Sequence, residues 1–172
     1  MAAVARHGWL WGRLSCFGLF VAGVVFAIDQ AHKWYVLHAM MLEGKGRVAM
    51  APFLDFVFTL NRGISYGLFP QSERDGQLLL AGFAVLVALV LWVYLARSID
   101  GRVAAAGLGL IIGGAVANAL DRVIYSGVVD YIQPHAFGWR WPYIFNIADV
   151  AIVAGVVLLL YDSFWPSRRV ES

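Results

Sequence analysis

The stretch that decides the fold is LLLAGFAVLVALVLWVYLA, residues 78–96, which lies between Asp75 and Arg97 and contains no charged residue. A helix needs about 20 largely apolar residues to cross about 30 Å of hydrocarbon. Three further stretches have the same character, so we expect membrane-spanning helices at about residues 10–30, 77–97, 103–121 and 145–163. An even number of spans places both ends of the chain on the same side.

The composition of the whole chain agrees with a membrane protein. Of its 172 residues 61% are hydrophobic and 14% are charged, and the mean hydropathy is +0.72. A soluble domain carries about 25% charged residues, and a disordered chain is poor in aromatic residues, which make up 15% here. A net charge of +2 without a long basic cluster argues against a nucleic-acid partner. We expect one integral membrane domain over residues 1–172.

The two longer connections, at about 36–77 and 123–144, are expected to lie outside the membrane and to contain a small β-sheet. Residues 53–60 place apolar side chains at alternate positions, which is typical of a strand with one apolar face. Residues 128–132 form a second strand candidate with Asp130 at its centre. The expected fold class is therefore an all-α membrane protein, a four-transmembrane-helix bundle with a small extracytoplasmic β-sheet region.

The third span contains small residues at every fourth position, namely Ala105, Gly109, Gly113 and Ala117. This spacing lets helix backbones approach closely in lipid, so we expect this helix at the centre of the bundle. The shorter connections hold Lys and Arg at higher density than the longer ones, and positive residues favour the cytoplasmic side. Both termini are therefore expected in the cytoplasm, with the longer connections on the outer face.

Four carboxylates lie at the outer ends of the expected spans or on the connection beside them: Asp29, Asp121, Asp130 and Asp149. Ionisable groups at a membrane boundary are costly and suggest a function. Asp29 can pair with Lys33, four residues later. The cluster of Asn118, Asp121 and Arg122 has two open interpretations: Arg122 neutralises an acid, or the cluster binds a polar group of a substrate.

Asp130 and Asp149 have no comparable structural explanation, because Asp149 has no basic neighbour in sequence and Asp130 lies between two strand residues. If the two converge, like charges prevent both from ionising, and the pair shares a proton. One carboxyl group can then act as general base on a water and the other as general acid. This is the chemistry of an aspartic protease, and it needs no metal and no cofactor.

Other chemistries have weaker support in the sequence. The histidines have no metal-ligand spacing, no G-x-S-x-G motif occurs, and the single cysteine, Cys16, cannot form an internal disulfide. A proton-conducting protein or transporter is the main rival, but it predicts acids at several depths of the membrane rather than at one end. A purely structural subunit predicts that all four acids tolerate substitution by Asn or Ala.

Several short blocks in order resemble the lipoprotein signal peptidases, also called signal peptidase II. The blocks are DQAHK at 29–33, NRGISYG at 61–67, NALDR at 118–122, VDY at 129–131 and FNIAD at 145–149. The sequence departs from the commoner family pattern at Ala117, Ser65, Tyr66 and Tyr131, and none of these positions carries a carboxylate.

The resemblance implies a catalytic pair of Asp130 and Asp149. It also implies a polar set that binds substrate or supports the site, consisting of Asp29, Lys33, Asn61, Gly63, Asn118, Asp121, Arg122 and Asn146. The implied enzyme is an endopeptidase of the bacterial cytoplasmic (inner) membrane that acts as a monomer among membrane lipids. Its implied substrate is a prolipoprotein, which is cut before a lipid-modified cysteine at the outer face.

Overall fold

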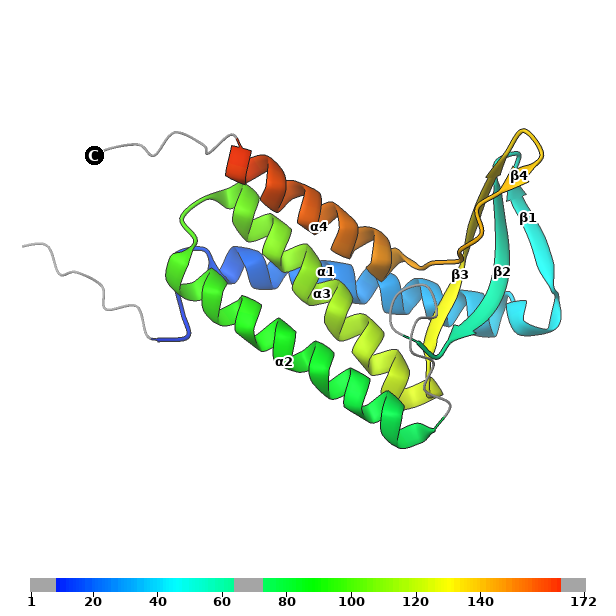
Figure 1. Ribbon diagram of the computed structural model, residues 1–172, viewed down its shortest axis with the longest axis horizontal. Coiled ribbons are helices and arrows are strands. Elements are labelled where there is room, and N and C mark those ends of the chain that lie inside the picture. Colours follow the sequence, from blue (N-terminus) through cyan, green and yellow to red (C-terminus); the bar gives the residue numbers. More distant parts are fainter. Residues whose placement is uncertain (1–8, 64–72, 165–172) are drawn as a thin grey trace, which may run out of the picture.

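The computed structural model describes residues 9–63 and 73–164. Four helices in this part are long and apolar enough to cross a membrane: α1 (Ser15–Trp34), α2 (Arg74–Ser98), α3 (Arg102–Tyr125) and α4 (Ile147–Phe164). They form a bundle with a small sheet at one end, and both ends of the described chain lie at the other (Figure 1). We call these the sheet end and the terminal end of the bundle. The expected fold class is confirmed.

The first helix begins later than the expected residue 10. Residues 9–14 form turns that place Gly12 directly against the backbone carbonyl of Ala96, where a Cβ would have no room. The amide of Gly12 donates to Oγ of Ser15 at 2.8 Å. These contacts fasten the start of α1 to the end of α2, and α1 then continues at the sheet end through a π-helical turn, η1 (Tyr35–Ala39).

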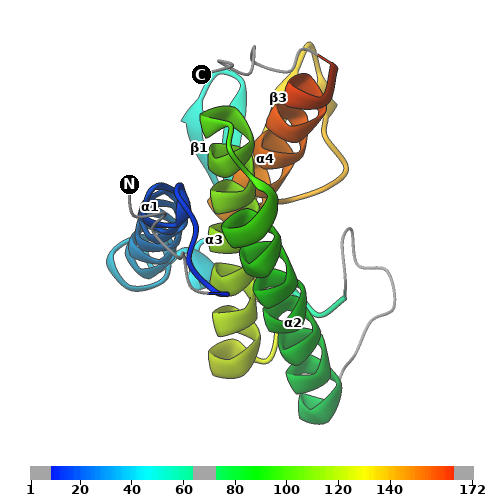
Figure 2. The same cartoon turned by 90° about the vertical axis from the view of Figure 1, so that its left-hand side faces the viewer.

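Helix α3 is the centre of the bundle, as its small residues predict. In its most apolar 18-residue stretch 56% is buried, against 17–28% in the corresponding stretches of the other three helices. Figure 2 shows the other helices arranged around it. A Cβ on Gly109 would lie 2.7 Å from the carbonyl of Gly18 in α1, and one on Gly114 would lie 2.6 Å from the carbonyl of Ala148 in α4. Glycine therefore allows backbone-to-backbone contact on two sides of α3.

The outward faces of the other helices carry large apolar side chains. Phe20 on α1 is 68% exposed, Leu79 on α2 is 75% exposed and Val153 on α4 is 60% exposed. Such faces would be unfavourable in water, and lipid is the medium that suits them.

The sheet is antiparallel with the order β1 (Arg47–Ala51), β2 (Leu54–Asn61), β3 (Val128–Ala136) and β4 (Trp139–Arg140), and a 3-10 turn, η2 (Leu42–Gly44), precedes it. Both expected strands are present, as β2 and the first half of β3. Leu60 pairs with Val129 and Thr59 pairs with Asp130, so Val129 and Asp130 point to opposite faces of the sheet.

A short bridge joins the sheet to the start of α4. The amide of Ile132 donates to the carbonyl of Phe145 at 2.8 Å, and the amide of Phe145 donates back to Ile132 at 3.1 Å. Since Asn146 follows immediately, this bridge places the first turn of α4 beside the strand that carries Asp130. The two acids without a structural explanation in the sequence are thereby brought to the same end of the bundle.

Candidate active site

A cavity of about 610 Å³ opens at the sheet end, and both Asp130 and Asp149 line it. Its polar part is formed by these acids together with Asn61, Asn118 and Arg122. Its apolar part runs between the spanning helices and the connection before α4, lined by Ala84, Ala115, Val128, Trp141, Ile144, Phe145, Val150, Ile152, Val153 and Ala154. The cavity thus joins a carboxylate-bearing end to an apolar channel within the bundle.

Asp130 is only 2% exposed, and amide groups hold both of its oxygens. Nδ2 of Asn61 donates to Oδ2 at 3.1 Å, and Nδ2 of Asn146 donates to Oδ1 at 2.7 Å. Burial, followed by the negative charge of Asp149, raises the pKa of Asp130 to about 7, although both hydrogen bonds favour the ionised form. Asp130 therefore binds a proton in the neutral pH range, which an ordinary aspartate does not.

Asp149 lies in the first turn of α4 and forms a reciprocal cap with Asn146. The amide of Asp149 donates to Oδ1 of Asn146 at 2.9 Å, and the amide of Asn146 donates to Oδ2 of Asp149 at 3.2 Å. This satisfies helix-start amides that would otherwise lack acceptors. Because the side chain of Asn146 donates to Asp130 and its backbone amide donates to Asp149, this one residue connects the two carboxylates.

Asn118 of α3 supports Asp149 from the other side. Its Nδ2 donates to Oδ1 of Asp149 at 2.9 Å, while its Oδ1 accepts from Nζ of Lys33 at 3.0 Å and from Nδ2 of Asn146 at 3.2 Å. An ammonium can only donate, so Lys33 determines which end of the Asn118 amide faces it. The amide nitrogen is consequently directed at Asp149.

Lys33 is the centre of a buried ion cluster beneath the cavity. Its Nζ lies 2.8 Å from Oδ2 of Asp29 and 2.7 Å from Oδ2 of Asp121, and the lysine is 2% exposed. The expected pair of Asp29 and Lys33 is therefore present. Asp121 takes the same lysine as its partner, so the charge that neutralises it comes from another helix rather than from its neighbour Arg122.

The two acids of this cluster also bind backbone amides. Oδ1 of Asp29 accepts from the amide of Ala148 at the start of α4, at 2.8 Å, and Oδ2 of Asp121 accepts from the amide of Val129 in β3, at 3.1 Å. Each carboxylate thus fastens an element that carries a member of the candidate pair. Asp29 and Asp121 hold the site together without lining the cavity.

Arg122 lines the cavity and contacts carbonyl groups. Its Nη1 donates to the carbonyl of Asn118 at 3.2 Å and its Nη2 donates to the carbonyl of Gly63 at 3.0 Å. The amide of Gly63 donates to Oδ1 of Asn61 at 3.0 Å, which orients the amide that reaches Asp130. Nε of Arg122 is buried and has no acceptor among residues 9–63 and 73–164.

Some supporting residues carry too weak a signal in the sequence to be singled out. Gln30 donates to Oδ1 of Asp121 at 2.9 Å, and Gln77, fully buried at the start of α2, donates to the carbonyl of Arg62 at 2.6 Å. Trp141 lines the cavity from the connection before α4. A polar amide at the end of an apolar span is the hint that Gln77 offers, and Gln30 lies in the DQAHK block without an assigned role. Within the same described residues, no group of His, Cys, Asp and Glu side chains could hold a metal ion.

The expected site residues within the described ranges gather at this one end of the bundle, whereas motif residues 64–67 lie outside those ranges. Catalysis by Asp130 and Asp149, and the supporting roles of the other eight, stay predictions. The arrangement nevertheless separates two carboxyl groups on the cavity wall from two that lie in the ion cluster beneath it.

Comparison with known proteins identifies the family. Residues 21–165 match the family model described as signal peptidase (SPase) II. A lipoprotein signal peptidase of Methylobacterium sp. (strain 4-46) is 46% identical over 88% of this chain and 91% of its own length, and that of Rhodopseudomonas palustris (strain TIE-1) is 45% identical over 90% and 96%. A solved bacterial membrane enzyme shares the fold, with a TM-score of 0.70 at 23% identity over 91% of this chain and 95% of the other. The chain is a multi-pass membrane protein that belongs to the signal peptidase II family.

Proposed function

We propose that this protein is a membrane-embedded aspartic endopeptidase that removes signal peptides from bacterial prolipoproteins. The curated relatives named above are called lipoprotein signal peptidases, which supports the substrate class. Cleavage falls before the lipid-modified cysteine of the precursor. Asp130 and Asp149 carry out the reaction, and no cofactor takes part.

The observation that carries this proposal is the placement of the two acids on one cavity wall. Asp130 and Asp149 come from a strand and a helix, line the same space and share Asn146 as a hydrogen-bonding partner. Each carboxylate is held by two donors from other residues, so its direction is defined before substrate arrives. Such preorganisation is what proton transfer at a fixed atom requires.

The proposed reaction uses one proton shared by the pair. The ionised carboxylate takes a proton from a water, and the oxygen of that water forms a bond to the carbonyl carbon of the scissile amide. The protonated partner donates its proton to the carbonyl oxygen. The amide nitrogen then receives the proton that the first carboxyl group took from the water and leaves as an amine, while the hydroxyl of the new carboxyl product returns a proton to the second carboxylate. Since the two groups titrate as a unit, neither role is assigned to one member.

The apolar channel suits the lipid chains of the substrate. Its walls between α2, α3 and α4 consist of alanine, valine and isoleucine side chains, which offer apolar contact and no hydrogen bond to an acyl chain. The lipid thus lies within the bundle while the scissile amide reaches the carboxylates.

The proposal includes a location. We place the enzyme in the cytoplasmic (inner) membrane as a monomer, with both termini in the cytoplasm and the cavity opening toward the outer face. This topology rests on the density of Lys and Arg in the shorter connections. It also fits the arrangement of the bundle, in which the site lies at the end opposite the described chain ends.

Cleavage of a lipid-modified precursor by the purified protein tests the function. The expected result is a peptide whose new N-terminus is the modified cysteine, as identified by mass spectrometry. The same precursor without the lipid is expected to be cut at least about 100-fold more slowly, since it lacks the apolar contacts of the channel. Equal cleavage of the two precursors, or a cut elsewhere, would contradict the proposal.

The pH dependence follows from the proton on Asp130. Its pKa is raised from 3.8 to about 7, so the pair retains the shared proton below pH 7 and loses it above. We expect kcat/KM to fall about tenfold per pH unit once the pH exceeds about 7. Measurement between pH 6 and 9 with a substrate that does not titrate in this range checks the prediction. A constant kcat/KM up to pH 9 would show that no shared proton is needed.

A further inference from the structure

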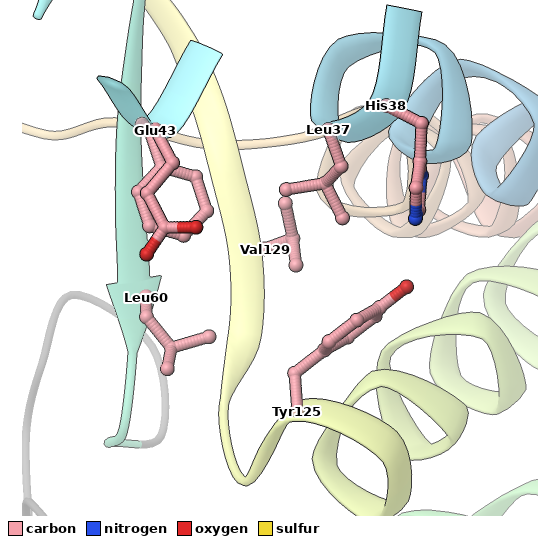
Figure 3. Close-up of a pocket in the computed structure, with 7 residues that line it drawn as sticks. Leu37, His38, Glu43, Leu60, Tyr125 and Val129 are labelled. Atoms are coloured by element: carbon pink, nitrogen blue, oxygen red, sulfur yellow. The ribbon is translucent and has the colours of Figure 1, made fainter. Parts of the chain in front are cut away.

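A second cavity lies on the other face of the sheet, behind the strands that carry Asn61 and Asp130. It has a volume of about 340 Å³ and an apolar floor made of Leu37, Phe58, Leu60 and Val129. Three polar side chains, His38, Glu43 and Tyr125, complete its lining. Figure 3 shows Leu37 and Val129 between Glu43 on one side of the view and His38 and Tyr125 on the other.

The polar lining consists of groups that can accept hydrogen bonds. Glu43 is exposed and has no hydrogen bond or ion pair to any of the residues in the described ranges. Nδ1 of His38 lies 3.1 Å from the carbonyl of Trp34, and a carbonyl only accepts, so Nδ1 carries the proton and Nε2 of the neutral ring has a lone pair. The hydroxyl of Tyr125 can also accept. A carboxylate without a cationic partner favours a cation that donates hydrogen bonds, which a primary ammonium does.

The position of this cavity indicates where the ammonium comes from. Tyr125 ends α3, and the preceding residues Val123 and Ile124 are 44% and 53% exposed. Trp34, at the end of α1, is 60% exposed. In a helix that spans a membrane these surfaces face lipid, and a Trp at a helix end is typical of the headgroup region. The cavity therefore lies where lipid headgroups meet the chain, and its apolar floor suits the carbon atoms beneath a headgroup.

We propose that this cavity binds a glycerophospholipid whose headgroup carries a primary ammonium, of the phosphatidylethanolamine class. The ammonium donates to the carboxylate of Glu43, and the polar groups of His38 and Tyr125 face the rest of the headgroup across the cavity. The glycerol and the first acyl carbons lie against Leu37 and the apolar residues of the two strands.

Binding at this cavity has a consequence for the strands of the first site. Leu60 and Val129 contact the lipid from one face of the sheet, whereas their neighbours Asn61 and Asp130 line the candidate active site on the other. A bound lipid braces β2 and β3 from behind at the point where they pair. The binding itself does not depend on the proposed protease activity.

Native mass spectrometry of the detergent-purified protein tests the binding. Phosphatidylethanolamine, phosphatidylglycerol and phosphatidylcholine with identical acyl chains are added at equal concentration, and the retained lipid is measured. We expect phosphatidylethanolamine to be retained about tenfold more than either of the others, since a charge-assisted hydrogen bond is lost in both. Phosphatidylglycerol lacks the cation, and the quaternary ammonium of phosphatidylcholine lacks N–H groups.

Substitutions locate the bound lipid. Glu43→Gln is expected to lower retention of phosphatidylethanolamine about tenfold, and Tyr125→Phe to lower it less. Glu73→Gln is the matched control, since Glu73 is an exposed carboxylate before α2 at the same end of the bundle, and its side chain caps no amide of that helix. Equal retention of the three lipids, wild-type retention by Glu43→Gln, or capture of a soluble lysine-containing peptide in place of the lipid would overturn the proposal.

Discussion

Asp130→Asn and Asp149→Asn are each expected to lower kcat/KM for the lipid-modified precursor by about 10³-fold or more. Asn has the shape of Asp but neither takes a proton from water nor donates one as an acid, so the substitution removes the general acid–base chemistry. Each Asn retains one oxygen, so it can keep one of the two hydrogen bonds that the carboxylate accepts, and the other donor loses its acceptor. Single-turnover cleavage measures the loss of activity.

Stability measurements separate this loss from misfolding. Because the pKa of Asp130 rises from 3.8 to about 7 on folding, its ionised form opposes folding, and the full cost of about 4 kcal/mol is present above pH 7. The cost declines as the pH falls from 7 toward 3.8. Asp130→Asn removes an ionisable group, so its Tm is expected to exceed that of the wild type at pH 8 and to approach it at pH 4.

Asp55→Asn is a matched control in the same sheet. Asp55 is a buried carboxylate, but it lies 3.0 Å from Nη1 of Arg47 and 3.2 Å from Nε2 of His135, outside the cavity. The hydrogen bond from Arg47 lowers the pKa of Asp55, so this acid stabilises the fold at neutral pH. The variant is expected to cleave normally with a lower Tm at pH 7. Normal turnover by either Asp130→Asn or Asp149→Asn would exclude the proposed pair.

Lys33→Met is expected to lower the free energy of unfolding by about 3–5 kcal/mol, because it leaves two buried carboxylates without their cation. For a chain of this size the corresponding fall in Tm is about 10 °C or more. Nζ of Lys33 lies within 2.8 Å of both Asp29 and Asp121 and is shielded from water, so solvent cannot replace it. Thermal unfolding in detergent, followed by tryptophan fluorescence, gives the comparison.

The same substitution is expected to reduce cleavage in the fraction that remains folded. Methionine cannot donate the hydrogen bond that Lys33 makes to Oδ1 of Asn118. The Asn118 amide, whose Nδ2 donates to Asp149, is then less well oriented. Lys45→Met removes an exposed lysine and is expected to change neither quantity. The double variant Lys33→Met with Asp121→Asn removes one of the stranded charges and should regain part of the lost stability. A Tm for Lys33→Met within 2 °C of the wild type corresponds to a stability loss of about 1 kcal/mol or less. That result would contradict the stabilising role given to the ion cluster.

Much of the fold is readable from the sequence because lipid imposes simple demands. A segment in lipid must satisfy all of its backbone hydrogen bonds internally, so a long uncharged stretch such as 78–96 predicts a helix with few alternatives. Small residues repeated on one helix likewise predict close packing, and Gly109 lies against the backbone of α1. The pair of Asp29 and Lys33 follows from local helix geometry, because residues four apart share a face.

The sequence could not show which distant groups meet. Arg122 is the cation next to Asp121 in the chain, yet Asp121 binds Lys33 from α1, and Arg122 turns to the carbonyls of Asn118 and Gly63. Sequence spacing controls contacts within one helix only, whereas contacts between helices depend on how the bundle packs. For the same reason, the hydrogen-bonding partners of Gln30 and Gln77 could not be predicted from the sequence.

The sequence by itself determined that most of the chain lies in lipid, how many helices span the membrane, and which few acids gather at one end of them. Hydropathy and residue spacing are local properties, and each of these conclusions needs nothing else. Only the tertiary structure decided that Asp130 and Asp149 line a cavity while Asp29 and Asp121 lie in the ion cluster beneath it. That division depends on two tertiary contacts. One is the bridge between β3 and the start of α4. The other is Lys33 from α1, which reaches Asn118 although the two residues are more than 80 positions apart in the chain.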